Sequence, residues 1–142
     1  MTSREPVTSS AEAEPVLILI VDDEEPIVEM LAAFVEDLGY TPLVAQNGQQ
    51  ALELARERWP ALIITDLMMP MLNGADLIKA LRTEAAVHGR ASPPIVLLTA
   101  GSARAARELE VEALLLKPFD LEQLEQVIHR LLGDEEDLIS LN

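Results

Sequence analysis

The chain has 142 residues, of which 49% are hydrophobic, and a net charge of −15. This length suits one domain with one core, and the hydrophobic content excludes a wholly disordered chain. The ten Lys and Arg residues are scattered, and the acidic balance argues against a nucleic-acid partner. The longest apolar run, 16–21, is too short to span a bilayer, and the chain contains no cysteine. We therefore expect a cytoplasmic protein without a membrane partner.

The composition divides the chain into three parts. Residues 1–14 are polar, lack apolar periodicity and are expected to form a disordered leader. One domain is expected over 15–133, and an acidic C-terminal tail over 134–142. Within the domain, apolar runs predict strands at 16–22, 41–45, 61–65, 94–98 and 113–116.

Helical patterns lie between and after these runs. The first helix has Pro26 in its first turn and Gly39 after its end, and its apolar positions are Ile27, Val28, Leu31, Phe34, Val35 and Leu38. Further helices are expected at about 48–58, 74–83 and 103–110, the last of which is short. The final helix follows Pro118, and its apolar face comprises Leu121, Leu124, Ile128, Leu131 and Leu132. This alternation predicts an α/β fold with a doubly wound, five-stranded parallel sheet and helices on both faces.

Four of the apolar runs end on a polar residue suited to phosphate chemistry. These residues are Asp22 and Asp23 after the first strand, Asp66 after the third, Thr99 after the fourth and Lys117 after the fifth. In an open parallel sheet the carboxyl ends of the strands lie along one edge, and ligands bind there. The sequence therefore predicts one pocket that contains three carboxylates, a hydroxyl and an ammonium group.

The acidic residues at 22–25 have two interpretations. Acids at the start of a helix cap it and interact favourably with its dipole, and this interpretation needs no ligand. However, Asp66 is expected at the same edge, and carboxylates about 4 Å apart repel each other by ~4 kcal/mol at an effective dielectric constant near 20. A divalent cation would offset that repulsion. Mg²⁺ suits the site because it takes one or two carboxylates, waters and substrate phosphate oxygens as ligands.

The loop after Asp66 gives the most specific signal. An ordinary loop between a strand and a helix is the simpler interpretation, but few such loops open with Asp on a buried strand and close on Asn-Gly. The pattern resembles the receiver domain of bacterial two-component response regulators over about 15–133. The motifs that carry the resemblance are Asp66-x-x-Met69-Pro70-x-x-x-Gly74, Asp22-Asp23, Thr99-Ala100 and Lys117-Pro118-Phe119.

The resemblance, which is to the single-domain, chemotaxis-regulator-like type, implies a fold and a set of roles. The fold would be flavodoxin-like with strand order 2-1-3-4-5. Asp66 would accept a phosphoryl group from a phosphohistidine, supplied by a sensor histidine kinase or a histidine phosphotransfer protein. Mg²⁺ would bind to Asp23, Asp66 and the backbone carbonyl of Met68, with Asp22 acting through a metal-bound water. Thr99 and Lys117 would bind phosphoryl oxygens, and a cis bond before Pro118 would aim Lys117 inward.

Two features depart from the family pattern. Receivers usually carry Tyr or Phe three residues before the lysine, as a side chain whose rotation reports phosphorylation, and here that switch position is Leu114. The interval from Thr99 to Lys117 also looks about one helical turn short. Both changes concern the output of the domain, and the phosphorylation pocket is intact.

We expect a stand-alone, phosphorylation-controlled binding module in a phosphorelay, with an unknown downstream protein partner. It would not be an enzyme, beyond self-phosphorylation from small phosphodonors and autodephosphorylation. Two alternatives are a receiver fragment of a longer regulator with an effector domain, and a receiver-like scaffold with altered switching. An aspartyl-phosphate phosphatase or mutase is disfavoured, because such enzymes generally need a second acid two residues after the nucleophile, where this chain has Met68.

Overall fold

The computed structural model describes residues 14–69, 71–101 and 103–133. The predicted leader, apart from Glu14, and the predicted acidic tail lie outside the described residues, as does Pro70 of the motif. The strands are β2 (Leu17–Val21), β3 (Thr41–Ala45), β4 (Leu62–Asp66), β5 (Ile95–Thr99) and β6 (Ala113–Leu116). The helices are α2 (Glu25–Asp37), α3 (Gly48–Glu57), α4 (Gly74–Val87), α5 (Arg104–Leu109) and α6 (Leu121–Leu131).

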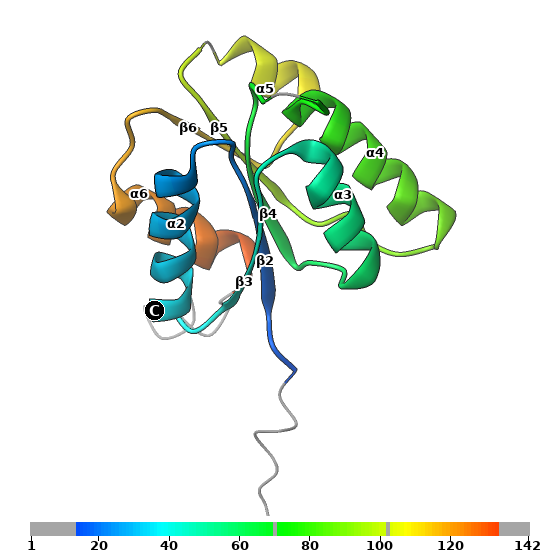
Figure 1. Cartoon of the computed structure of the whole chain (residues 1–142), viewed down its shortest axis with the longest axis horizontal. Coiled ribbons are helices and arrows are strands. Elements are labelled where there is room, and N and C mark those ends of the chain that lie inside the picture. Colours follow the sequence, from blue (N-terminus) through cyan, green and yellow to red (C-terminus); the bar gives the residue numbers. More distant parts are fainter. Residues whose placement is uncertain (1–13, 70, 102, 134–142) are drawn as a thin grey trace, which may run out of the picture.

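The five strands form one parallel sheet in the order β3-β2-β4-β5-β6. Counted along the chain, this is the predicted order 2-1-3-4-5, which is therefore confirmed. The helices cover both faces, with α2 and α6 on one side and α3 and α4 on the other (Figure 1). Among the described residues, none of the helices combines the length and the apolar character needed to cross a membrane.

Each face of the sheet has its own apolar core, because alternate strand residues point to opposite faces. On the α2/α6 side, Ile18, Ile20 and Ile64 pack against the helices, and Leu31 and Leu124 are among the fully buried helix residues. On the α3/α4 side the corresponding core contains Leu19, Ile63, Leu97, Ala51, Leu77 and Ile78. Residues on both faces of the central strands are buried, which explains their continuous Val, Ile and Leu composition.

The helix boundaries match the sequence with one clear difference. Pro26 lies in the first turn of α2, and Gly39 follows this helix with a φ of 99°, as expected. The predicted end of the third helix at residue 83 is wrong, since α4 continues to Val87. Glu84 and Ala85 favour helix, Ala85 is buried, and Glu84 forms an ion pair of 2.9 Å with Arg56 of α3. Local helix propensity and contacts with the rest of the fold together account for the extra turn.

The short helix α5 is confirmed, and it has six residues. Its carboxyl end is held by Arg82 of α4, which donates hydrogen bonds of 2.6 Å to the Leu109 carbonyl and 2.9 Å to the Glu110 carbonyl. Glu110 follows the helix with a φ of 57°. A charged side chain from the neighbouring helix thus satisfies carbonyls that the short helix leaves open.

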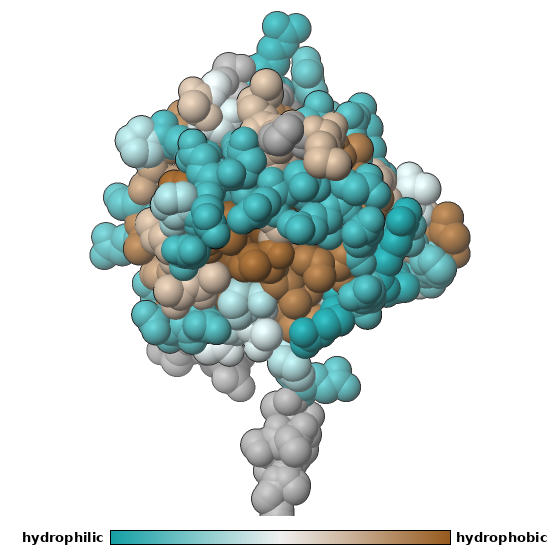
Figure 2. Space-filling model, in the orientation of Figure 1, coloured by the Kyte–Doolittle hydropathy of each residue, from teal (hydrophilic) through white to brown (hydrophobic). Residues whose placement is uncertain are grey.

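The edge strand β3 has few free donors on its outer side. The Thr41 amide donates inward to Val16, so the alternation of strand hydrogen bonds turns Pro42 and Val44 outward, and Gln46 directly follows the strand. Pro42 has no N–H group, and the Gln46 amide donates to the Gln50 side chain at 2.7 Å. Val44 is 44% exposed. Figure 2 shows hydrophobic residues gathered in the middle of this view, with hydrophilic residues around them.

Candidate functional site

The predicted polar residues meet at the carboxyl edge of the sheet. Asp66 and Thr99 are the last residues of β4 and β5, while Asp22 and Lys117 directly follow β2 and β6. One pocket at this edge is lined by Asp23, Glu24, Asp66, Leu67, Met68, Thr99, Ala100, Gly101 and Lys117. The sheet order places β2, β4 and β5 side by side, and this arrangement brings distant parts of the chain together.

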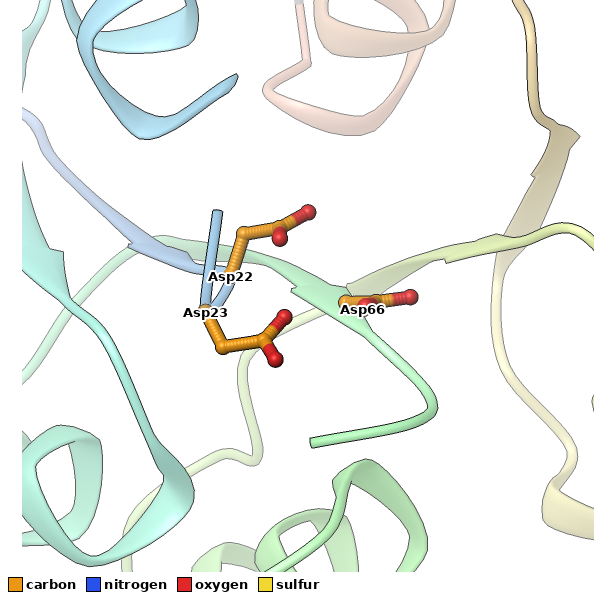
Figure 3. Close-up of side chains that lie close together, drawn as sticks. All are labelled: Asp22, Asp23 and Asp66. Carbon is orange, nitrogen blue, oxygen red and sulfur yellow. The ribbon is translucent and has the colours of Figure 1, made fainter. Parts of the chain in front are cut away.

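Three carboxylates form the acidic part of the site. Asp22, Asp23 and Asp66 offer oxygen atoms that all lie within 4.8 Å of one another. Figure 3 shows Asp22 and Asp23 at the end of β2, with Asp66 nearby on β4. Asp22 is fully buried and Asp66 is 7% exposed, whereas Asp23 is open to solvent. This set of hard oxygen donors, with one open side, fits a Mg²⁺ ion that keeps several waters.

Backbone groups fix the orientation of these carboxylates. Asp22 Oδ1 accepts a hydrogen bond of 2.9 Å from the Glu24 amide, and the Asp22 amide donates to the Ala45 carbonyl. Asp66 Oδ1 accepts one of 2.9 Å from the Leu67 amide. The carboxylates are therefore held by the main chain at the two strand ends and need no rearrangement to face one another.

Lys117 supplies the positive charge of the site. Its Nζ lies 3.1 Å from Asp22 Oδ2 and 3.6 Å from Asp66 Oδ2. Burial opposes the charged form, but the hydrogen bond to Asp22 and the charges of both carboxylates outweigh burial and raise the pKa of Lys117 above 10.5. The lysine is thus a fixed ammonium group that bridges two strand ends. The Lys117–Pro118 peptide bond is cis, as the family resemblance implied.

Asp66 is the carboxyl group whose environment is most unusual. Burial raises its pKa above the ordinary 3.8, and the charges of Asp22 and Asp23 act in the same direction. Lys117 and the Leu67 amide lower it but do not compensate fully. A perturbed carboxyl group in a pocket, beside a fixed cation, is typical of a reactive site.

The remaining predicted residues occupy different places. The Thr99 side chain is buried, and its Oγ1 accepts a hydrogen bond of 2.9 Å from the Gly101 amide. Met68 lines the pocket and is 72% exposed. It occupies the position where an aspartyl-phosphate phosphatase or mutase would carry its second acid. Leu114 lies away from the pocket, where it packs against the α3/α4 core and lines an open depression beside α5.

Sequence reasoning missed Glu24, Leu67 and Gly101 as lining residues of the pocket. Their contributions include backbone amides, and two of these amides bind Asp22 and Asp66 directly. Each lies within three residues of a predicted strand end. Their place just after a strand end was the signal that they line the pocket, although no particular side-chain type marks it.

Comparison with known proteins gives one consistent family. The sequence profile of the response regulator receiver domain matches residues 18–129. Response regulator Rre1 of Synechocystis sp. is 36% identical over 129 residues, which are 87% of this chain and 54% of that protein. The DNA-binding response regulator MtrA of Mycolicibacterium smegmatis is 35% identical over 124 residues, which are 84% of this chain and 52% of that protein. The chain thus spans about half the length of these curated relatives.

Solved structures show the same fold. The chemotaxis response regulator CheY4 of Vibrio cholerae has a TM-score of 0.74 and 29% identity, and the match covers 83% of this chain and 99% of that one. The receiver domain of Ssk1 from Saccharomyces cerevisiae, solved with the histidine phosphotransfer protein Ypd1, has a TM-score of 0.76 and 28% identity. That match covers 82% of this chain and 88% of the other.

Proposed function

Because this chain belongs to the receiver domain family of two-component response regulators, we propose that Asp66 accepts a phosphoryl group from a phosphohistidine. The observation that carries this proposal is the position of Asp66. Its carboxylate lies at a strand end within 4.8 Å of two other carboxylates and 3.6 Å from Lys117 Nζ. Phosphoryl transfer depends on positioning and charge neutralisation, and these are what such a site supplies.

The donor set supports Mg²⁺ as the cation. Asp23, Asp66 and the backbone carbonyl of Met68 would hold it, and Asp22 would act through a bound water. When bound, Mg²⁺ supplies positive charge that offsets the charge on the transferred phosphoryl oxygens. The exposure of Asp23 leaves a path for the ion and for the phosphodonor.

The transfer itself exchanges one bond to phosphorus for another. An Asp66 carboxylate oxygen attacks the phosphorus atom, a P–O bond forms, and the bond between phosphorus and the donor histidine nitrogen breaks. Lys117 then pairs with one phosphoryl oxygen, and the Thr99 hydroxyl donates a hydrogen bond to another. Asp66 must be ionised to attack.

The proposed role is that of a phosphoacceptor protein without turnover of an external substrate. Self-phosphorylation from small phosphodonors and autodephosphorylation would be its only reactions. Its partners would be a sensor histidine kinase or a histidine phosphotransfer protein on the input side, and a protein of unknown identity on the output side. We place it in the cytoplasm, where such kinases act. It would work as a stand-alone binding module or as the receiver part of a longer regulator.

The test is phosphorylation by labelled acetyl phosphate. The wild-type protein should form an acid-stable, base-labile adduct only with Mg²⁺ present. Asp66→Asn should abolish the labelling, whereas Asp76→Asn, the same change at an exposed carboxylate on α4, should leave it unchanged. Labelling that persists in Asp66→Asn would refute the assignment, and turnover of a phosphomonoester would favour a phosphatase instead.

A second candidate is a receiver scaffold that no longer switches, which Leu114 and the six-residue α5 favour. Amide exchange over residues 100–120 should be compared with and without a beryllofluoride phosphate mimic. Slower exchange with the mimic supports a working switch, and unchanged exchange supports the scaffold.

A further inference from the structure

Two helices begin unusually close to the connection that follows Asp66. A Cβ atom placed on Gly48, the first residue of α3, would overlap the Leu72 carbonyl oxygen and lie 2.8 Å from both the Leu72 carbonyl carbon and its Cβ. A Cβ atom on Gly74, the first residue of α4, would lie 2.5 Å from the Asp66 carbonyl oxygen and 2.9 Å from the Leu67 Cα. Neither glycine has a positive φ. The close approach of the chain therefore explains glycine at these two positions.

Hydrogen bonds run through the same contacts. The Gly48 amide donates to the Leu72 carbonyl at 3.1 Å, and the Gly74 amide donates to the Leu67 carbonyl at 2.9 Å. The Leu67 amide in turn binds Asp66 Oδ1 at 2.9 Å and the Leu98 carbonyl at 3.1 Å. The start of α3 is thus connected, through Leu72 and the main chain, to the residues around the Asp66 carboxylate.

The position of Gly48 allows the effect of a side chain on helix α3 to be distinguished from its effect on the contact with Leu72. Asn47 already caps α3, because its side chain accepts a hydrogen bond of 2.8 Å from the Gln50 amide. Alanine at position 48 would suit the helix better than glycine. Any loss of stability caused by alanine at position 48 must therefore come from contact with Leu72. The backbone atoms of Leu72 cannot move aside as the end of a flexible side chain can.

We propose that Gly48 is a positioning residue for the phosphoacceptor site. Its bare Cα lets the first amide of α3 hold the Leu72 carbonyl, two residues before Gly74, whose own amide holds the Leu67 carbonyl between Asp66 and Met68. The proposal rests on the proposed function, in which the Met68 carbonyl and Asp66 bind Mg²⁺. Gly48 itself touches neither the metal site nor the phosphoryl group.

The experiment compares Gly48→Ala with Gln49→Ala. Gln49 is exposed in the same helical turn, and its side chain donates a hydrogen bond of 3.5 Å to Glu53. Supporting groups around a metal site typically contribute about 10- to 100-fold in affinity. We therefore expect the Mg²⁺ dissociation constant, measured by calorimetry, to rise at least about tenfold in Gly48→Ala. Gln49→Ala should stay within about twofold of wild type.

Amide exchange of the metal-free proteins gives a readout that does not depend on activity. The Gly74 amide should exchange faster in Gly48→Ala, while the amides of β2 and β5 keep their protection and show that the fold is intact. If Gly48→Ala does not fold, the wild-type protein still tests the idea, because Mg²⁺ should slow exchange of the Gly48 amide. Unchanged Gly48 exchange on Mg²⁺ binding would overturn the proposal.

The two hypotheses fail in different ways. Wild-type protein that binds Mg²⁺, together with Gly48→Ala that binds it within about twofold as tightly, overturns the role of Gly48 alone. Wild-type protein that neither binds Mg²⁺ nor labels with acetyl phosphate overturns the proposed function, and the role of Gly48 with it.

Discussion

Replacing Asp66 with Asn should make the metal-free protein more stable, although it should destroy the phosphoacceptor. One oxygen of Asp66 lies within 4.8 Å of one oxygen of Asp22 and one of Asp23. At this distance and an effective dielectric constant of about 20, each pair of charges repels by about 3.5 kcal/mol. Lys117 Nζ, 3.6 Å from Asp66 Oδ2, offsets about 4.6 kcal/mol of that repulsion. Burial of the carboxylate is the largest effect that destabilises its charged form, and the balance of these charges adds roughly 2 kcal/mol before water screens the exposed Asp23.

The assay is urea unfolding at pH 7 with EDTA. The free energy of unfolding should be about 2 kcal/mol higher for Asp66→Asn than for wild type. Asp37→Asn makes the same change at an exposed carboxylate near the end of α2, and should alter stability by less than about 0.5 kcal/mol. Equal or lower stability of Asp66→Asn in EDTA would refute the reasoning. Adding Mg²⁺ should stabilise wild type by mass action and reduce the difference.

The pH dependence follows from the sign of the shift. The pKa of Asp66 is raised in the folded state, so the unfolded chain loses this proton first as the pH rises. Wild-type stability should therefore fall, relative to Asp66→Asn, from the unfolded pKa near 3.9 up through the folded pKa. At lower pH both forms carry a neutral side chain, and their stabilities should converge. A gap that stays constant across this range would contradict the assignment of the effect to ionisation.

Three further changes should act on separate parts of the molecule. Lys117→Met leaves the fully buried Asp22 without its ion pair. The free energy of unfolding of the metal-free protein, measured in urea, should therefore fall by about 2 kcal/mol or more. An unchanged free energy would mean that the ion pair contributes nothing to stability. Asp120→Ala removes the capping box of α6 and should lower the unfolding free energy by about 1 kcal/mol while the Mg²⁺ dissociation constant stays the same; a weaker metal site would contradict a purely local cap. Arg82→Met removes two hydrogen bonds to the end of α5 and should speed amide exchange over residues 104–110 without changing exchange in β4; uniform acceleration would indicate global destabilisation instead.

The strand ends were the most predictable part of the molecule. Buried parallel strands are continuous apolar runs, so the polar residue that ends each one stands out, as Asp66 and Thr99 do. The strand order came from the family resemblance, because apolar runs alone do not determine which strands are neighbours. The ion pair of Lys117 with Asp22 was not predicted, since in the resemblance the lysine binds a phosphoryl oxygen.

The features that escaped prediction depend on contacts between distant segments. The last turn of α4 carries an ion pair between Glu84 and Arg56 of α3, and no local pattern marks that pair. The close approach of Gly48 to Leu72 is also invisible in the sequence, because glycine at the start of a helix is unremarkable. Local propensity describes each segment, whereas the packing between segments determines where a helix ends and where a side chain cannot fit.

The outer side of β3 has a consequence for how the protein behaves at high concentration. An edge strand normally offers a row of amides on which another chain can build a further strand, and this is a common beginning of aggregation. Here Pro42 has no amide hydrogen, and the Gln50 side chain occupies the Gln46 amide. Of the two residues of β3 that face outward, Val44 has an amide with which another strand could pair. Exchanging Pro42 for a residue with an N–H group should therefore promote edge-to-edge association of sheets without disturbing the pocket at Asp66.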